Sequence, residues 1–325
     1  MTRPIHGIFL LALCVSAVPP VFAAPTVTTR TVVSDVHQKT FRTPGQAVSS
    51  LIAANRNGET RALLAILGPE GAKLIVSGDP VADQYGRARF VAAYDDSHTL
   101  VFNGQGKAVL VVGKEQWPFP VPLIRTPAGW RFDTAAGEEE ILDRRIGRNE
   151  FSAIETCRIY VTAQRKYAAT VQRTGGGPHT YARQFMSTAG THDGLYWPAG
   201  PGDEESPLGP LIANARAGGY VDNPHQKLEP YHGYYFRILS RQGPDAPGGA
   251  RNYVVDGQMT GGFALVAYPA TYGDSGVMTF VASMDGIVYQ KNLGPKTANV
   301  ASQITQYDPD VSWQAVQENP SAPVN

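Results

Sequence analysis

The stretch GEEEILDRRIGRNEFSAIETCRIYVTAQRKYAA (Gly137–Ala169) decides how the chain is organised. Four of its apolar side chains recur at helical spacing and share one face: Leu142, Ile146, Ile154 and Val161. Many of the other positions carry charged residues, so the stretch predicts one long amphipathic helix. Gly147 is the position at which this helix can bend or divide.

The residues before this helix, 42–136, predict a small unit in which helices precede strands. Thr43 can cap a first helix with Pro44 at its first position, and Asn57-Gly58 ends it. Further helices are expected at 60–67 and 80–94, and strands at 99–102, 108–112, 117–123 and 129–132. Three alternate prolines in 117–123 remove amide donors from one edge, so this segment predicts an edge strand.

The residues from 137 to 315 predict a second unit, in which the long helix precedes an antiparallel sheet. After an irregular region and a short helix, strands are expected at 233–239, 263–268, 277–281 and 287–290. Strands cluster instead of alternating with helices, which indicates an α+β chain of two units joined near residue 136.

The two ends of the chain predict an exported protein. Arg3, an apolar run at 8–18 and the small or compact residues Val21-Phe22-Ala23 are typical of a signal peptide over residues 1–24. We therefore expect a periplasmic or secreted protein with a flexible lead-in at 25–41 and a disordered tail at 316–325. Signal removal takes Cys14 away and leaves Cys157, which falls on the apolar helix face and is expected to be a buried thiol.

Composition limits the partners. The formal net charge of the 325 residues is +0, which argues against nucleic acid or an anionic membrane as a partner. Outside the predicted signal peptide, no apolar run approaches the roughly 20 residues of a membrane span. A partner protein of the envelope or a cell-wall component is the expected partner.

Two groups of aromatic and histidine residues are the candidate ligand-binding sites. They are His192, Asp193, Tyr196 and Trp197 in one segment, and His232 and Tyr235 in another. Aromatic rings beside an imidazole can bind a sugar ring, a peptide side chain or another surface. The alternative interpretation is structural, with Tyr234 and Phe236 facing the core and His192 completing a loop.

No catalytic motif is evident. Gly273-Asp274-Ser275-Gly276 is similar to the nucleophile segment of chymotrypsin-like proteases, but Val277 and Met278 replace the next two residues of that pattern and no matching histidine block precedes it. A turn before a strand explains the same residues. Asp79 and Asp83 can be paired carboxylates, although Asp79 near a helix start is more simply a cap. We expect no metal site and no cofactor, since their motifs are missing.

Several segments together resemble the bacterial family catalogued as domain of unknown function 2950. The segments that carry the resemblance are 67–71, 77–83, 117–120, 129–134, 147–150, 193–198 and 230–236. The match covers about residues 41–315 and implies an exported bacterial protein with no assigned activity, cofactor or catalytic residue. In outline, the first unit is also similar to nuclear-transport-factor-like cones and the second to pilin-like modules, which bears on fold alone.

We therefore expect a non-catalytic exported protein with a binding or structural role. One alternative is a periplasmic hydrolase in which His192, Asp193 and His232 meet in a cleft. Another is a pilin-like assembly component.

Overall fold

The computed structural model describes residues 37–104, 106–173, 180–200, 202–220 and 229–317. They belong to the compact unit that begins at Val36. The predicted signal peptide at 1–24 lies outside the described residues, as does the lead-in up to residue 36.

The first part of the unit is helical, as the sequence predicts. Its elements are α1 (Pro44–Arg56), α2 (Thr60–Leu67), the 3-10 turn η2 (Pro69–Gly71), α3 (Ala72–Ile75) and α4 (Pro80–Asp96). The predicted cap of α1 is present, because the Gln46 amide donates to the Thr43 hydroxyl over 3.2 Å. The short turns η2 and α3 have no signal in the sequence, since they are too brief to show a period.

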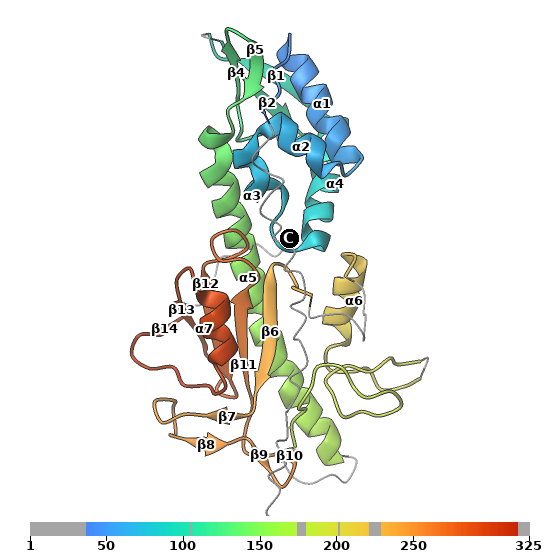
Figure 1. Ribbon diagram of the computed structural model, residues 1–325. Coiled ribbons are helices and arrows are strands. Elements are labelled where there is room, and N and C mark those ends of the chain that lie inside the picture. Colours follow the sequence, from blue (N-terminus) through green and yellow to red (C-terminus); the bar gives the residue numbers. More distant parts are fainter. Residues whose placement is uncertain (1–36, 105, 174–179, 201, 221–228, 318–325) are drawn as a thin grey trace, which may run out of the picture. The chain divides into compact units, whose positions relative to one another are not determined.

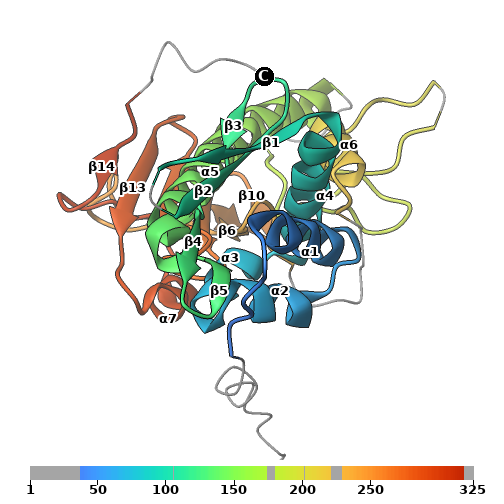
Figure 2. The same ribbon diagram turned by 90° about the horizontal axis from the view of Figure 1, so that it is seen from above.

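A five-stranded antiparallel sheet follows these helices. It contains β1 (His98–Phe102), β2 (Lys107–Val112), β3 (Trp117–Pro118), β4 (Leu123–Thr126) and β5 (Gly129–Phe132), with β1, β2, β4 and β5 in that order and β3 beside β2. Figure 2 shows α1, α2 and α4 on one side of this sheet, and α1 and α2 contact β5 while α4 contacts β1 and β2.

The proline-rich segment corrects one prediction. Only Trp117 and Pro118 form a strand, which pairs with the Val111–Val112 end of β2. The expected single edge strand over 117–123 is wrong in extent, because the chain bends at residues 120–121 and leaves the ladder there. The chain instead re-enters the sheet as β4, pairing with the other end of β2.

The end of the predicted lead-in is tied into this sheet. Phe41 exchanges backbone hydrogen bonds of 2.8 Å with Trp130. The Gln38 side chain donates to the carbonyl groups of Ile66 and Phe132 over 3.2 and 2.8 Å. Gln38 and Phe41 are therefore anchored to the first part of the fold.

The long helix exists and is longer than predicted. It is α5 (Thr134–Arg173), 40 residues without interruption at Gly147. Its beginning belongs to the first core, where Ile141 packs, and its later turns belong to the second core, where Ala153 and Cys157 are buried. One helix thus contributes to both hydrophobic cores.

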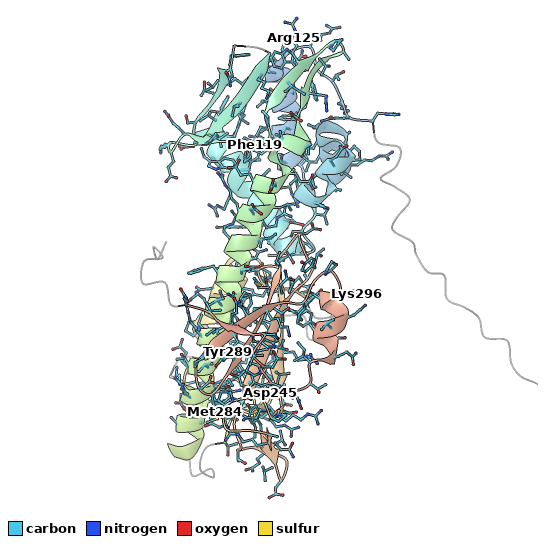
Figure 3. The ribbon with its side chains drawn as sticks, turned by 90° about the vertical axis from the view of Figure 1, so that its left-hand side faces the viewer. Phe119, Arg125, Asp245, Met284, Tyr289 and Lys296 are labelled. Atoms are coloured by element: carbon cyan, nitrogen blue, oxygen red, sulfur yellow. The ribbon has the colours of Figure 1, made fainter. Side chains whose placement is uncertain are left out.

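The second sheet is also antiparallel, in the order β14 (Gln314–Ala315), β13 (Val288–Asn292), β12 (Met278–Ser283), β11 (Ala264–Pro269) and β6 (Tyr234–Leu239). The four predicted strands are confirmed within two residues. Helix α5 contacts β11, β12 and β13, and α7 (Thr297–Gln303) contacts β11; Figure 1 shows the two helices on opposite faces. Figure 3 shows Met284 beside α5, where its carbonyl accepts a 2.9 Å hydrogen bond from Arg165.

Smaller elements complete the second part. They are α6 (Gly209–Ala217) and two antiparallel strand pairs, β7 (Arg241–Gln242) with β8 (Arg251–Asn252), and β9 (Val254–Val255) with β10 (Gln258–Met259). Val316, at the start of the predicted tail, donates its amide to Val288 over 2.8 Å, while residues 318–325 lie outside the described part.

These observations confirm the α+β class with antiparallel sheets. Two separate clusters of buried side chains form the cores, one from residues 47–132 and one from residues 153–307. The division into units 42–136 and 137–315 stays a prediction. In the described part of the chain, no helix has both the length and the apolar character needed to cross a membrane.

Candidate functional site

The first predicted group lies on an ordered turn, which we call the His192 loop (residues 187–193). The Asp193 carboxylate accepts three hydrogen bonds, from the Thr188 amide and hydroxyl over 2.7 and 2.8 Å and from the Thr191 hydroxyl over 2.7 Å. Together these bonds lower the pKa of Asp193 to about 2; the hydrogen bond from the Thr191 hydroxyl contributes most, followed by the two from Thr188. Asp193 is therefore an anion that holds the loop closed, and it is a poor proton donor or acceptor near neutral pH.

The aromatic residues of this group form the base of the loop. Tyr196 and Trp197 are only 6% and 4% exposed and belong to the second core. The Trp197 indole donates to the Glu204 carbonyl over 3.1 Å, and the exposed His192 ring stacks on Trp197 with centroids 4.2 Å apart. Of the four residues, His192 and Asp193 face solvent, while the two large rings support them.

The loop backbone is fixed on both sides. Ser187 donates its amide to the Tyr196 carbonyl over 2.7 Å, and the Tyr196 amide donates to Phe185 over 2.8 Å. A Cβ at Gly194 would lie 2.7 Å from the Ser187 amide nitrogen, so only glycine allows this approach. The result is an exposed loop whose shape is held by hydrogen bonds within the protein.

The second predicted group surrounds a buried carboxylate, and we call it the Asp79 cluster (Asp79, Tyr220, Tyr231, His232 and Gly233). Asp79 is 1% exposed and caps α4 by accepting from the Ala82 amide over 3.0 Å. Its other oxygen accepts from the Tyr220 hydroxyl over 2.9 Å and from the Gly233 amide over 2.8 Å. The predicted capping role of Asp79 is present, together with two contacts that the sequence did not indicate.

His232 takes part in this cluster mainly through its backbone. Its amide donates to the Tyr220 hydroxyl over 3.0 Å, and its backbone φ is 48°, in the left-handed region. Burial lowers the pKa of the imidazole, and the Asp79 charge opposes that shift. Burial, followed by the Asp79 charge, raises the pKa of Tyr220. Burial in the cluster therefore favours the neutral forms of the imidazole and of the phenols around the Asp79 carboxyl group.

Tyr235, the other residue predicted with His232, lies on β6. It pairs across the sheet with Tyr268, with ring centroids 5.6 Å apart. Burial raises its pKa, and the Asp79 charge contributes to the same shift. Tyr235 is thus a half-buried neighbour of the Asp79 cluster.

The protease-like segment forms a turn with its serine inside. Ser275 is fully buried; its hydroxyl donates to the Thr271 carbonyl and accepts from the Thr271 amide. From α5, the Asn149 side chain donates to the Ser275 carbonyl over 2.9 Å, and Glu150 accepts the amides of Val277 and Met278. The serine is a structural residue of the turn.

The predicted residues thus form two sets. His192 contacts Trp197, whereas His232 contacts Tyr220 and Tyr231. Within the residues that the structure describes, no hydrogen bond, ion pair or ring contact joins His192 or Asp193 to His232, and no group of three metal-ligating side chains is close enough to hold an ion.

The fold and these contacts define an α+β protein whose predicted site residues serve as loop supports and caps. The chain belongs to the family described as "Protein of unknown function (DUF2950)", whose model matches residues 38–316. Neither the curated proteins nor the solved structures that were searched contain a match.

Three of the segments that resemble this family meet in space. Segment 77–83 supplies Asp79, segment 230–236 supplies Gly233, and segment 147–150 supplies Asn149. A Cβ at Gly233, whose φ is 76°, would lie 2.5 Å from the Asn149 amide nitrogen. Tyr220 had no signal in the sequence, because no local pattern links it to Asp79, which lies 141 positions away.

Proposed function

We propose that the protein is an exported, non-catalytic component of the bacterial envelope that binds a partner protein or a wall component through the His192 loop. The observation that carries this proposal is the loop itself, an exposed turn held in one shape by the three hydrogen bonds to Asp193. A pre-organised loop loses little conformational freedom on binding, which favours affinity.

The contacts support binding over hydrolysis. General acid–base catalysis needs a group whose pKa lies near the working pH and which can reach the reacting atom. Asp193 is saturated with donors and has a pKa of about 2, and the hydroxyl of Ser275 is used within its own turn. The hydrolase alternative would require His192 and His232 to act together, and their described contacts lie in different sets.

Export is part of the proposal and has its own test. Cells that express the full chain should contain, in the periplasmic or culture fraction, a form shortened by about the first 24 residues, as the signal pattern predicts. Intact-mass measurement of the fractionated protein measures this directly. A full-length form confined to the cytoplasm would contradict export.

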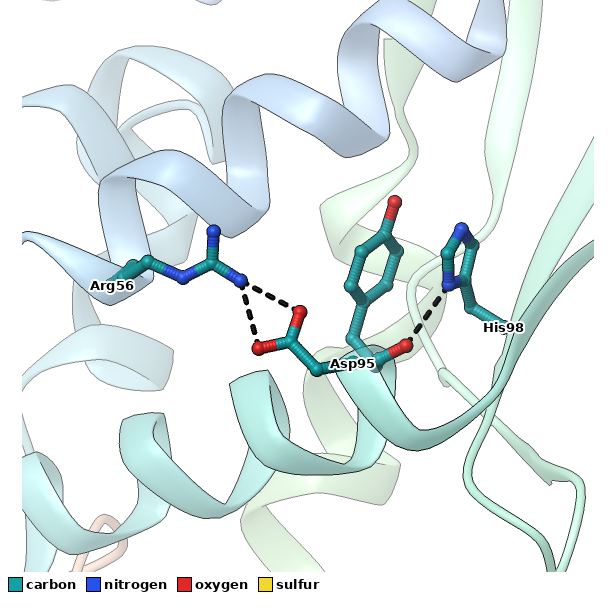
Figure 4. A network of polar contacts seen from close by, with 4 residues as sticks. Arg56, Asp95 and His98 are labelled. Carbon is teal, nitrogen blue, oxygen red and sulfur yellow. Dashed lines mark hydrogen bonds and ion pairs between the residues drawn. The ribbon is translucent and has the colours of Figure 1, made fainter.

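Binding through the loop is tested with two matched histidine variants. His192→Ala removes an exposed imidazole that stacks on Trp197, and His98→Ala removes an exposed imidazole that stacks on Tyr94 with centroids 3.7 Å apart. Figure 4 shows His98 beside the tyrosine ring at the end of α4, far along the chain from the loop. Each substitution should cost about the same small stacking energy, roughly 0.5–1.5 kcal/mol.

The readout is capture from envelope extracts by immobilised wild-type and variant proteins, with the bound material quantified by mass spectrometry. We expect a specific component of the extract to be enriched several-fold less by His192→Ala than by the wild type. His98→Ala should enrich this component as much as the wild type does. Equal capture by all three proteins would remove the His192 loop from the binding surface.

A further inference from the structure

An open pocket of about 310 Å³ lies in the second part of the chain, and its lining is unusual in charge. It is lined by Arg183, Ser240, Arg241, Asn252, Val254 and Thr305. The volume reaches the lower range of small-molecule sites, roughly 300 Å³. Two of the six lining residues are cations, three carry neutral hydrogen-bonding groups, and none is an acid.

The first cation is held in place by the fold. The Arg183 guanidinium donates to the Gly257 carbonyl, in the β9–β10 turn, over 2.9 Å. The backbone of the preceding residue, Ala182, forms two hydrogen bonds with the buried Gln164 side chain. The Ala182 N–H donates to Gln164 over 2.9 Å, and the Gln164 side-chain amide donates to the Ala182 carbonyl over 2.8 Å. One further residue back, the Tyr181 amide donates to Met259 over 2.8 Å. Arg183 is therefore on a fixed backbone although its side chain reaches solvent.

The second cation is on a strand. Arg241 lies on β7 directly opposite Asn252 on β8, so these two lining residues are cross-strand neighbours. The Arg241 guanidinium donates to the Thr305 hydroxyl over 3.0 Å. The backbone carbonyl of Arg241 accepts a hydrogen bond from the Tyr307 amide over 2.9 Å. Behind the strand pair, the buried Gln242 amide donates to Gly249 and accepts from the Tyr253 hydroxyl.

Among the residues that the structure describes, neither guanidinium forms an ion pair with a carboxylate. The ion pairs in the described part of the chain involve other arginines and lysines, whereas Arg183 donates to a backbone carbonyl and Arg241 to a hydroxyl. A guanidinium has five N–H donors, so each keeps several for a ligand. Two like charges that face one pocket repel each other until an anion lies between them.

We propose that this pocket binds an oxyanion carried on a polar ligand, namely a carboxylate or phosphate group on a hydroxylated molecule such as a sugar. The two guanidinium groups would hold the oxyanion, because their planar donors match carboxylate and phosphate oxygens. The Ser240, Asn252 and Thr305 side chains would contact the hydroxyl groups of the ligand. The proposal does not depend on the His192 loop, which contributes no lining residue.

The test is calorimetric titration of the purified full-length protein with three probes: D-glucuronate, D-glucose 6-phosphate and D-glucose. Binding of glucuronate, of glucose 6-phosphate or of both, with no binding of glucose, supports the proposal and identifies which oxyanion is preferred. Binding should also weaken as salt is added. Equal binding of glucose, or no binding of either anion, would overturn it.

Variants locate the site. Arg183→Gln and Arg241→Gln should each weaken binding of the anionic probe roughly ten- to hundredfold, the range for one hydrogen bond to a charged group. Arg125→Gln makes the same change on the exposed face of β4, which Figure 3 places in the first sheet, and should leave binding unchanged. Arg241→Lys should bind with intermediate strength, because an ammonium keeps the charge and loses the planar fork. If the pocket variants bind as Arg125→Gln does, the pocket is not the site.

Discussion

Replacement of Asp79 by alanine is expected to be among the most destabilising single changes in this protein. The substitution removes the cap of α4, which is worth about 1 kcal/mol. It also removes the acceptor of the Tyr220 hydroxyl and the buried Gly233 amide, and hydrogen bonds to a charged group are worth about 1.5–3 kcal/mol each. These contacts share one carboxylate and do not add in full, so we expect a loss of about 3–5 kcal/mol in the free energy of unfolding.

The same helix supplies a matched control. Asp95 near the end of α4 pairs with Arg56, as Figure 4 shows, but both side chains are 53% exposed. Such an exposed pair contributes about 0–1 kcal/mol, so Asp95→Ala should have little effect. Asp79→Asn should fall between the two, because asparagine caps helices well but replaces one of the two accepting oxygens with an NH2 donor.

Urea unfolding followed by tryptophan fluorescence and by far-UV circular dichroism measures these losses. Coincident transitions from the two probes justify a single free energy for each variant. If Asp79→Ala and Asp95→Ala differ by less than about 1 kcal/mol, the Asp79 cluster does not stabilise the fold as its burial implies.

Two further predictions concern titratable groups. The His232 pKa is lowered in the folded protein, so the unfolded chain binds its proton more readily, and this residue should cost stability as the pH falls below its unfolded pKa of about 6.5. The test is His232→Asn, because asparagine tolerates the left-handed backbone at this position. In urea titrations, the free energy of unfolding of this variant should fall less than that of the wild type between about pH 7 and pH 5. Identical pH dependence of the two proteins would contradict the prediction. Burial raises the pKa of the Cys157 thiol to about 12, so iodoacetamide should label this residue only after unfolding. Peptide mass spectrometry measures the labelling. Rapid labelling of the native protein would be inconsistent with the position of Cys157 in the core.

Much of the fold could be predicted from local chemistry. The cap at Thr43, the alternating burial along β2 and the amphipathic pattern of α5 are each set by neighbours within one or two turns or within one strand. Short elements such as α3, β7 and β14 carry too few residues for any period to appear. The sequence did not predict that residues 117–123 divide into two strands. That division depends on which residues of β2 each part pairs with, and this register is set only in the folded sheet.

The candidate site was predictable only in part. Aromatic and histidine residues at 192–197 do lie together, since they are adjacent in sequence, but their burial reverses the expected roles: Trp197 supports and His192 is presented. Arg183 and Arg241 carry no motif, and only the pocket brings them together.

The sequence by itself determined the positions of the main helices and strands, the α+β class and the resemblance to the family that matches residues 38–316. The element positions and the class follow from hydrophobic period, capping and turn residues, which act between near neighbours, whereas the resemblance rests on matching sequence segments. The tertiary structure alone decided which partners satisfy the buried polar groups, such as Tyr220 and Gly233 at Asp79, separated from it by 141 and 154 positions. A buried carboxylate needs hydrogen-bond donors, and folding can bring these donors from residues far away in the sequence. A local sequence pattern therefore does not show which residues they are.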